Sequence, residues 1–425
     1  MAVTVGQEVE LVVEKPAAGG RMIARLDGEV LLVAGAIPGE RIAAVVTRAE
    51  KRVSFADTLR VIEASPDRCE PAGDPLCGGT VYSHIVYGRQ ILLKADIIRD
   101  AYTRIGRIPV EGAVVVERSI EQGYRMRARL HVRDGSPGFY REGSRELCDA
   151  RQTGQLLEGS VAAVEEAVAA LQAQGITTIS VELSENMAAD QRAIHVDLRD
   201  AKPSGEALDR AVSAAGLTGL TARTTGNAFY SAGDPIVNDP LSALTSGRAI
   251  EGALRRHPQS FFQGNRSLLP TLCTAVIDSV QPGSVVDLYA GVGLFAVSLA
   301  ACGHDQITAV EGDPDSGKDL LRNAAPFYDR LRVARASVEA FLGRGFETPP
   351  ANLVLDPPRT GMSKEAGDAV ARSGAARIVY VSCDPPTMAR DARRLLDGGY
   401  RLVSLRGFDL FPNTPHVETL GVFER

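Results

Sequence analysis

From residue 282 onward, short apolar runs alternate with segments that favour helices, and this alternation constrains the fold more than any other feature of the chain. The runs are rich in β-branched residues and are bounded by glycine or proline turns, as buried parallel strands are. We therefore expect an open α/β sheet of the Rossmann-like class. One strand should begin at residue 284, and the others should cover residues 306–310, 352–355 and 378–381.

A glycine turn and a carboxylate indicate a nucleotide-type ligand on this sheet. Gly291 and Gly293 follow the first strand and let the backbone approach a ligand closely. Glu311 ends the second strand, twenty residues beyond Gly291, where a carboxylate accepts hydrogen bonds from ribose hydroxyls. A dinucleotide requires a fuller glycine fingerprint. The loop, Glu311 and the strand that ends at Asp356 therefore favour S-adenosylmethionine, a single nucleoside without pyrophosphate.

Cys383 lies just beyond the strand at residues 378–381, where open α/β sheets place reactive groups. A helix is expected over residues 387–396, and a thiol near a helix N-terminus can be favoured as its thiolate. A single cysteine is more often a small buried core residue. Its position at a strand end, followed at once by an Asp-Pro-Pro sequence, favours a nucleophile instead.

The first 66 residues predict a small β-barrel of the OB type, because five short strands are separated by turns. Its arginines and lysines are equally compatible with an RNA-binding surface and with an ordinary solvated face. The expected strands cover residues 9–13, 20–25, 30–33, 41–48 and 58–62; the basic residues are Arg21, Arg25, Arg41, Arg48, Lys51, Arg52 and Arg60.

Residues 67–260 predict an α+β central domain. Residues 125–132 alternate arginine with apolar residues, so one face of a strand should carry a row of arginines. Beside Tyr124, Phe139 and Tyr140, such a row suits RNA phosphates and stacked bases. It could also be an exposed strand face balanced by nearby acidic residues. The expected helices cover residues 87–105 and 160–173, a turn covers 134–138 before a hairpin partner at 139–147, and further strands cover 178–183 and 193–196.

The composition excludes several classes of protein. The chain has 425 residues, 44% of them hydrophobic and 24% charged, as expected of a soluble protein with more than one domain. Its net charge of −6 does not indicate a polyanion partner, so nucleic acid would have to bind local basic patches. No signal peptide, membrane span or disulfide framework is apparent. We expect a cytoplasmic protein.

Four stretches of sequence together resemble the RNA uracil-5-methyltransferases, the family that makes 5-methyluridine in ribosomal and transfer RNA. The resemblance covers nearly the whole chain, and its N-terminal barrel looks like a TRAM domain. The stretches are Ser-Phe-Phe-Gln-Gly-Asn at 260–265, Asp-Pro-Pro-Arg-Thr-Gly at 356–361, Ser-Cys-Asp-Pro-Pro-Thr-Met-Ala-Arg-Asp at 382–391 and Phe-Pro-Asn-Thr-Pro-His-Val-Glu at 411–418.

The resemblance implies a catalytic mechanism and a set of site residues. Carbon C5 of uracil is a poor nucleophile until a thiolate adds at C6, and a base must later remove the C5 proton. By resemblance Cys383 is the nucleophile and Glu418 is the base. The residues implied to line the cofactor and target-base pocket are Gln263, Tyr289, Glu311 and Asp356, beside the glycine loop at Gly291.

The same resemblance implies three domains: a TRAM-like barrel at 1–66, a central RNA-binding domain at 67–260, and a catalytic domain at 261–425. The helical segment at 87–118 is expected to pack on the catalytic domain. The expected partner is RNA, bound by a monomer. A TRAM-like barrel favours 23S ribosomal RNA over transfer RNA, because such barrels are commoner in the ribosomal branch.

One departure from the family concerns metal binding. Members with a [4Fe-4S] cluster hold it with four cysteines. In this chain Cys69 and Cys77 could form half of a metal site, but Thr80 and Thr153 stand at the two other ligand positions. Cys148 could substitute for one of them, which leaves three thiolates. We therefore expect no cluster and no metal ligands.

Two other functions compete with this interpretation. A methyltransferase for the exocyclic amine of adenine typically has an aromatic residue after Asp-Pro-Pro, whereas this chain has Arg359. A non-catalytic RNA-binding protein that retains the fold would not need Cys383, Glu418 and Gln263 together.

Overall fold

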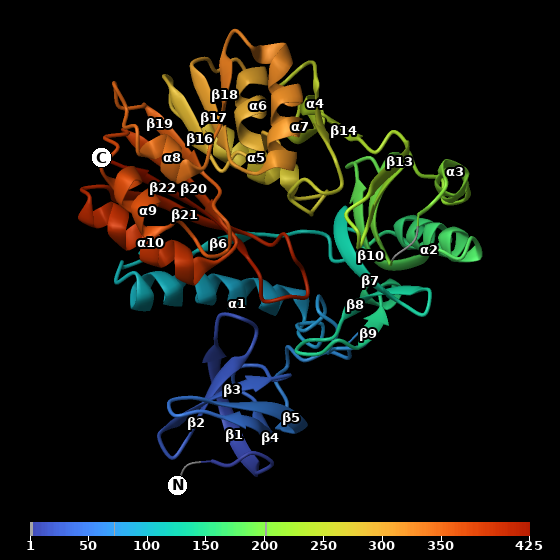
Figure 1. Ribbon diagram of the computed structural model, residues 1–425. Helices are drawn as coiled ribbons and strands as arrows, with labels where there is room; N and C mark the ends of the chain where they lie inside the picture. Colours follow the sequence, from blue (N-terminus) through green and yellow to red (C-terminus); the bar gives the residue numbers. More distant parts are fainter. Residues whose placement is uncertain (1–2, 72, 200–201) are drawn as a thin grey trace.

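The computed structural model describes residues 3–71, 73–199 and 202–425. They form a closed barrel at the N-terminus, a seven-stranded sheet and an eight-stranded sheet (Figure 1). The α/β class, the Rossmann-like sheet and the N-terminal barrel are therefore confirmed. Among the described residues, no helix is both long and apolar enough to cross a membrane.

The barrel closes through the strand order β1-β2-β3-β5-β4. Val9, Leu11 and Val13 alternate with exposed residues along β1, so that one face of the strand fills the barrel interior. The strands are β1 (Glu8–Pro16), β2 (Met22–Leu26), β3 (Glu29–Ala34), β4 (Arg41–Ala49) and β5 (Ser54–Glu63).

The central sheet has the order β13-β12-β11-β10-β7-β8-β9. Its helices α2 (Glu158–Ala173) and α3 (Gly205–Ala214) lie beside it, on the side away from the catalytic sheet (Figure 1). The turn after β7 is shorter than expected, because Asp134 and Gly135 both take positive φ and close a two-residue hairpin. The strands are β7 (Arg127–Arg133), β8 (Ser136–Tyr140), β9 (Leu147–Asp149), β10 (Thr177–Glu185), β11 (Arg192–Arg199), β12 (Gly219–Thr224) and β13 (Phe229–Gly233).

A small hairpin joins the central sheet to the catalytic sheet. Strands β14 (Val237–Pro240) and β15 (Ala253–Arg256) pair antiparallel around the short helix α4 (Leu241–Leu244). Arg256 is fully buried and donates hydrogen bonds to the Asp239 carboxylate and to the carbonyl of Glu185. The hairpin is thereby anchored to β10 of the central sheet.

The catalytic sheet has the order β18-β17-β16-β19-β20-β22-β21-β6, with β22 antiparallel between β20 and β21. Alternate residues face opposite layers: Val354 and Val379 pack beneath α5 and α6, while Leu355 and Tyr380 pack against α9 and α10. The strands are β16 (Val285–Leu288), β17 (Ile307–Glu311), β18 (Leu331–Arg335), β19 (Asn352–Leu355), β20 (Arg377–Ser382), β21 (Arg401–Phe408) and β22 (Glu418–Glu424). The helices are α5 (Leu269–Ser279), α6 (Leu294–Ala301), α7 (Pro314–Ala324), α8 (Val338–Leu342), α9 (Lys364–Ala371) and α10 (Pro385–Asp397).

The segment between barrel and central sheet crosses to the catalytic sheet. Helix α1 (Tyr87–Asp100) lies along α10 and β21, and β6 (Val115–Glu117) pairs parallel to β21 at the sheet edge (Figure 1). The helix predicted over 87–105 is interrupted, since Ala101–Ile105 form a π-helical turn. Ile105, at the end of this turn, is exposed, whereas Lys94 is fully buried.

Lys94 is buried because it pairs with an acidic residue of the catalytic sheet. Its Nζ donates to the Asp409 carboxylate and, at 3.0 Å, to the carbonyl of Phe411. Both side chains of the ion pair are completely shielded from solvent. Burial lowers the pKa of Lys94, and the Asp409 charge opposes that shift. The pair therefore joins α1 to the connection between β21 and β22.

Removing one partner of this pair should destabilise the fold strongly. We expect Lys94→Met to lower the free energy of unfolding by about 3–5 kcal/mol, because Asp409 would keep an uncompensated buried charge. A double variant with Asp409→Leu should recover most of the loss. Urea denaturation measures both.

The exposed pair of Lys318 and Asp315, 3.0 Å apart, offers a matched control. Lys318→Met should change the free energy of unfolding by no more than about 1 kcal/mol. Equal losses for Lys94→Met and Lys318→Met would contradict the anchoring role of the buried pair.

Candidate functional site

The register between β20 and β22 brings the predicted nucleophile and the predicted base to facing positions. Ser382 of β20 pairs with Thr419 of β22. Cys383 follows Ser382 and Glu418 precedes Thr419, so the next positions of the antiparallel pair hold a thiol and a carboxyl. Both lie at the carboxyl edge of the parallel strands, where α/β sheets bind ligands.

Glu418 is a buried carboxyl beside a second one. Within the described residues its Oε1 has no hydrogen-bond partner. Burial raises the pKa of Glu418 well above its usual value, the nearby Asp356 raises it further, and Arg359 opposes the shift. Burial raises the pKa of Asp356 to about 7, although Gln263 Nε2 donates to its Oδ2 at 3.3 Å. Carboxyls with such raised pKa values can exchange protons near neutral pH.

The Cys383 thiol is harder to ionise than the sequence suggested. Burial raises its pKa to about 11, the charge of Glu418 adds to the shift, and Arg359 opposes it. The helix predicted from residue 387 begins at Pro385, with Asp384 as its cap. The Asp384 carboxylate accepts a hydrogen bond from the Thr387 amide at 2.8 Å, so an anion already occupies the helix start. Burial outweighs the helix dipole at this thiol.

Arg359 is the cation that lowers the pKa of the Cys383 thiol, and sequence reasoning assigned it no role. Its guanidinium nitrogen Nη2 lies 3.3 Å from Nε2 of His416. Burial and the Arg359 charge lower the pKa of His416 to about 4, so the imidazole is neutral at physiological pH. Arg359 is therefore the positive charge available to stabilise a Cys383 thiolate. Its place in the Asp-Pro-Pro-Arg sequence was the signal that could have identified it.

The glycine turn and Glu311 meet at the neighbouring strand ends. Gly291 has a φ of 57°, and its amide donates to Glu311 Oε2 at 2.7 Å. The Asp313 amide donates to Glu311 Oε1 at 2.6 Å, so both carboxylate oxygens are oriented by backbone. A side chain at Gly291 would meet open space, whereas one at Gly293 would collide with Val297. An open backbone approach beside a fixed carboxylate fits a nucleoside cofactor.

Two further residues lie in β16 or directly after it. Tyr289 follows β16 with a positive φ of 63°, an uncommon backbone conformation for a tyrosine that is found at functional sites. Its side chain is half-buried, and burial raises its pKa. Asp287 is buried within β16, and its Oδ2 accepts a hydrogen bond from the Ala296 amide at 3.0 Å. That bond holds the first turn of α6 against the strand.

The segment that carries Gln263 is held from two sides. Asp319 of α7 accepts hydrogen bonds from the His257 amide at 2.8 Å and from the Ser260 hydroxyl at 2.7 Å. Asn265 donates to the carbonyl of Leu410 at 2.9 Å. Gln263 is thereby fixed between α7 and the connection that leads to β22.

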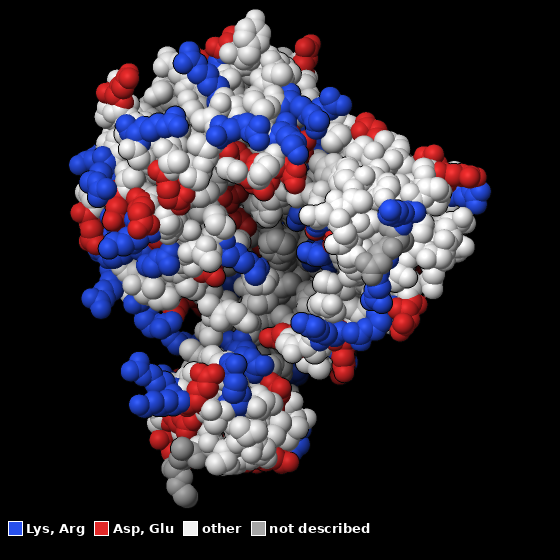
Figure 2. Space-filling view, in the orientation of Figure 1, with Lys and Arg blue, Asp and Glu red and all other residues white. Residues whose placement is uncertain are grey.

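A hollow separates the central sheet from the catalytic sheet (Figure 2), and Arg127 and Arg129 of the arginine row lie on β7 of the central sheet. Figure 2 shows Lys and Arg side chains on both walls of this hollow and on the barrel below it. Arg127 and Arg129 lie within 4 Å of Glu182, so part of their charge is balanced on the strand face. Tyr124 and Phe139 are buried and cannot stack on bases, contrary to the sequence expectation. The alternation of arginine with apolar residues did not reveal that these two aromatic rings are buried.

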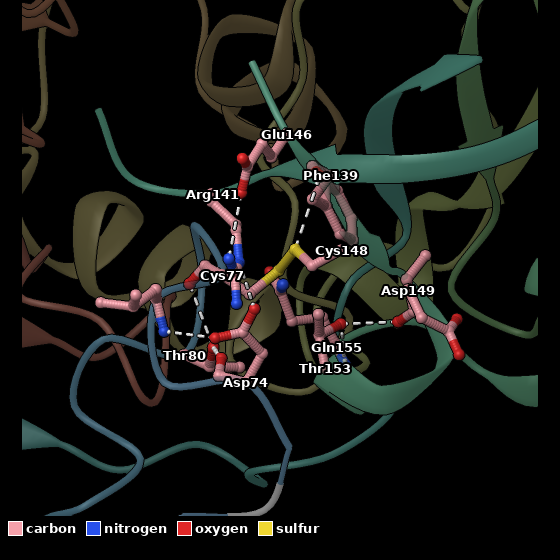
Figure 3. The surroundings of a disulfide bond; sticks show 12 residues. Asp74, Cys77, Thr80, Phe139, Arg141, Glu146, Cys148, Asp149, Thr153 and Gln155 are labelled. Carbon is pink, nitrogen blue, oxygen red and sulfur yellow. Dashed lines mark hydrogen bonds and ion pairs between the residues drawn. A yellow bond between two sulfur atoms is a disulfide. The ribbon is translucent and has the colours of Figure 1, made fainter. Parts of the chain in front are cut away.

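The cysteines divide into a bonded pair and four free thiols. Cys77 and Cys148 form a disulfide (Figure 3), which sequence analysis did not anticipate. Cys69 is apart from them and donates to the carbonyl of Ser83. The hydroxyls of Thr80 and Thr153 donate to backbone carbonyls of their own loops. Across the described ranges, no group of three or more His, Cys, Asp or Glu could hold a metal ion, so these residues do not fit a four-thiolate cluster.

Models of two known protein families match parts of this chain. A model of the tRNA (uracil-5-)-methyltransferase family matches residues 347–425, which include Asp356, Cys383 and Glu418. A TRAM domain model matches residues 2–59.

Full-length relatives are similar throughout. The 23S rRNA (uracil(1939)-C(5))-methyltransferase of Pseudomonas fluorescens is 32% identical, over 99% of this chain and 92% of its own length. The enzyme of the same name from Alkalilimnicola ehrlichii is 30% identical, over 96% of this chain and 94% of its own length. An uncharacterised RNA methyltransferase of Streptomyces coelicolor is 32% identical, over 99% of this chain and 93% of its own length.

One solved structure has the same fold over its whole length. The tRNA (uracil-54, C5)-methyltransferase of Pyrococcus abyssi, in complex with S-adenosyl-L-homocysteine, superposes with a TM-score of 0.78. The superposition covers 97% of this chain and 99% of that one, at 22% identity.

The raised pKa of Cys383 predicts how the thiol reacts with an alkylating agent. Only the thiolate reacts, so between pH 7 and pH 9 the alkylation rate of Cys383 should rise about tenfold per pH unit. Arg359→Gln should slow the reaction about tenfold at a given pH, because the charge that lowers the pKa is lost.

Peptide mass spectrometry after timed alkylation measures each thiol separately. Cys302, at the end of α6, is the internal control, and its rate should not respond to Arg359→Gln. A Cys383 rate that is already independent of pH at pH 7 would contradict the raised pKa.

Proposed function

The chain belongs to the RNA uracil-5-methyltransferase family, and we propose that Cys383 and Glu418 act in it as nucleophile and base on a uridine of 23S ribosomal RNA. It is an S-adenosylmethionine-dependent enzyme that transfers a methyl group to C5 of uridine in RNA. The observation that supports the two roles is the strand register, which sets the thiol and the buried carboxyl opposite each other.

In the proposed mechanism, Cys383 gives its proton to solvent and its thiolate bonds to C6 of the target base. The C5=C6 double bond breaks, and its electrons make C5 nucleophilic. Arg359, which lowers the pKa of this thiol, stabilises the thiolate. Bound S-adenosylmethionine would supply the electrophilic methyl group to C5, and its methyl–sulfur bond would break to leave S-adenosylhomocysteine. Glu418 then accepts the C5 proton, the C5–H electrons restore the double bond, and the C6–sulfur bond breaks to release the thiolate. Its raised pKa makes the ionised Glu418 carboxylate a stronger base than an exposed glutamate, so it must give up its own proton before it can accept the C5 proton.

We propose that the cofactor is held at the carboxyl ends of β16, β17 and β19. Glu311 is oriented to accept hydrogen bonds from ribose hydroxyls, and the backbone at Gly291 permits close approach. Tyr289 supports the cofactor from the end of β16. Gln263 and Asp356, hydrogen-bonded to each other, line the boundary between cofactor and target base.

RNA binding is proposed to involve all three parts of the chain: the barrel at 1–66, the central domain at 67–260 and the catalytic domain at 261–425, with 87–118 packed on the last. Lys and Arg side chains on the walls of the hollow, which also carry Asp and Glu (Figure 2), support this proposal. The target C5 is hidden in stacked RNA, so the uridine must be flipped out or lie in a loop. We also propose that the enzyme acts as a monomer in the cytoplasm.

Substitution of the two proposed catalytic residues should have different outcomes. Cys383→Ala should abolish covalent RNA adducts and lower turnover by a factor of about 10³ or more. Glu418→Gln should trap the methylated adduct, because the C5 proton cannot leave. Denaturing gels with labelled cofactor detect the adduct, and Cys302→Ala is the control. A Cys383→Ala protein that turns over at the wild-type rate would refute the nucleophile.

The choice of 23S ribosomal RNA can be tested in cells. Deleting the gene should remove a 5-methyluridine from 23S ribosomal RNA, and the wild-type gene should restore it. Nucleoside mapping by mass spectrometry of separated RNA classes gives the result. Loss of 5-methyluridine from transfer RNA alone would instead support the substrate named for the Pyrococcus abyssi enzyme.

A further inference from the structure

The disulfide joins two parts of the chain that carry different functions. Cys77 lies in the connection between β5 of the barrel and α1, and Cys148 lies in β9, the edge strand of the central sheet. Their Cα atoms are 5.9 Å apart and 71 positions separate them in sequence. Both residues are buried, with exposed fractions of 1% and 8%. The bond therefore fastens the connection, residues 73–86, to the central sheet.

Hydrogen bonds hold the connection along the same edge (Figure 3). The Gly78 amide donates to the carbonyl of Tyr140 at 3.0 Å, and the Glu142 amide donates to the carbonyl of Leu76 at 2.7 Å. Arg141 Nε donates to Asp74 Oδ2 at 2.6 Å. These contacts lie at the protein surface or near it, whereas the disulfide is the buried member of the group. Loss of the covalent bond would leave mainly bonds that water can replace.

The other end of the connection, at Tyr82, contacts the 409–417 loop, which precedes the proposed base Glu418. The Tyr82 amide donates to the carbonyl of Asn413 at 2.9 Å. Gln90 Nε2 donates to Asn413 Oδ1 at 2.8 Å, and the Asn413 amide donates back to Gln90 Oε1 at 2.9 Å. Asn413 lies in the 409–417 loop, shortly before His416 and Glu418. A displacement of the connection would therefore reach the loop before β22.

A second route leads from the disulfide to the same loop. Gly79 lies so close to Gln155 that an added Cβ would come 2.2 Å from its Nε2. Gln155 Oε1 accepts a hydrogen bond from Arg125 at 2.6 Å. The Arg125 backbone bridges to Asn265, whose side chain donates to the carbonyl of Leu410 at 2.9 Å. Both routes end within the 409–417 loop.

We propose that the Cys77–Cys148 disulfide is a redox-sensitive brace that holds the 409–417 loop in position for RNA, through the connection between barrel and α1. The inference rests on the proposed RNA site and adds a means of regulating it. Reduction releases the connection from β9, loosens the loop and weakens RNA binding. The cofactor side of the site, at β16 and β17, is not part of either route and keeps its affinity.

The redox step is a thiol–disulfide exchange. The thiols of Cys77 and Cys148 give up two protons and two electrons to a disulfide of the low-molecular-weight or protein class, which leaves as two thiols. A dithiol reverses the reaction and is itself oxidised to a disulfide. Because both cysteines are buried, exchange requires local opening of the connection and is slow in the native protein.

The first test counts thiols. Full-length protein incubated with oxidised glutathione and denatured in an alkylating agent without reductant should show four labelled cysteines, Cys69, Cys273, Cys302 and Cys383. Treatment with dithiothreitol before denaturation should raise the number to six. Labelled Cys77 and Cys148 in the glutathione-treated protein would overturn the proposal.

The second test compares the two redox states. Hydrogen exchange of peptides covering 409–417 should be about fivefold faster or more in the reduced protein, with a lower Tm, while the affinity for S-adenosylmethionine stays unchanged. The KM for unmodified 23S ribosomal RNA should rise by a similar factor. Equal exchange of the 409–417 peptides in both states would overturn the brace.

Variants separate the bond from general effects of the reductant. The Cys77→Ala/Cys148→Ala double variant should behave like the reduced protein and ignore dithiothreitol, whereas Cys69→Ala should respond as the wild type does. A Cys69→Ala variant that no longer responds to dithiothreitol would overturn the assignment to Cys77 and Cys148. A failure of the proposed function would show differently, as a modified nucleoside other than 5-methyluridine with the redox effect on the 409–417 peptides intact.

Discussion

The antiparallel pairing of β22 with β20 is the constraint on which the site depends. Parallel strands alone would deliver Asp356 and Cys383 to the same edge of the sheet, but a reversed strand is needed to bring a residue from the opposite direction. The register that pairs Ser382 with Thr419 brings Glu418 to Cys383. A slip of one residue would turn Glu418 to the other face of the sheet and separate the two groups.

Burial then determines the chemistry of the groups that this register assembles. The side chains of Asp287 and Glu418 are buried and Asp356 is partly buried, and burial raises the pKa of each carboxyl. Such a cluster costs stability, since three acids share a low-dielectric environment. The Lys94–Asp409 pair shows the alternative, in which a buried acid is paired with a buried cation. Among the described residues, the three raised-pKa carboxyls thus have no ion-pair partner such as Lys94 provides for Asp409.

Local sequence patterns predicted the helices and strands. Contacts between residues far apart in the sequence determined the burial and bonding that those patterns do not reveal. The strands ending at Glu311, Asp356 and Cys383 follow from β-branched runs closed by glycine or proline, which are short-range signals. The burial of Lys94 depends on Asp409, which is 315 positions away, and the bond of Cys77 depends on Cys148. The raised pKa of Cys383 comes from desolvation, which a helix start in the sequence does not reveal. Domain bounds and residue roles stay predictions.

The position of β22 has a consequence for how the chain folds. Residues 418–424 are synthesised after every other strand of the catalytic sheet, yet β22 lies in its interior, between β20 and β21. Until these residues leave the ribosome, β20 and β21 expose unpaired edges and Cys383 has no carboxyl opposite it. The sheet therefore closes late. A nascent chain can acquire its barrel early, but catalytic competence arises only when the last strand inserts.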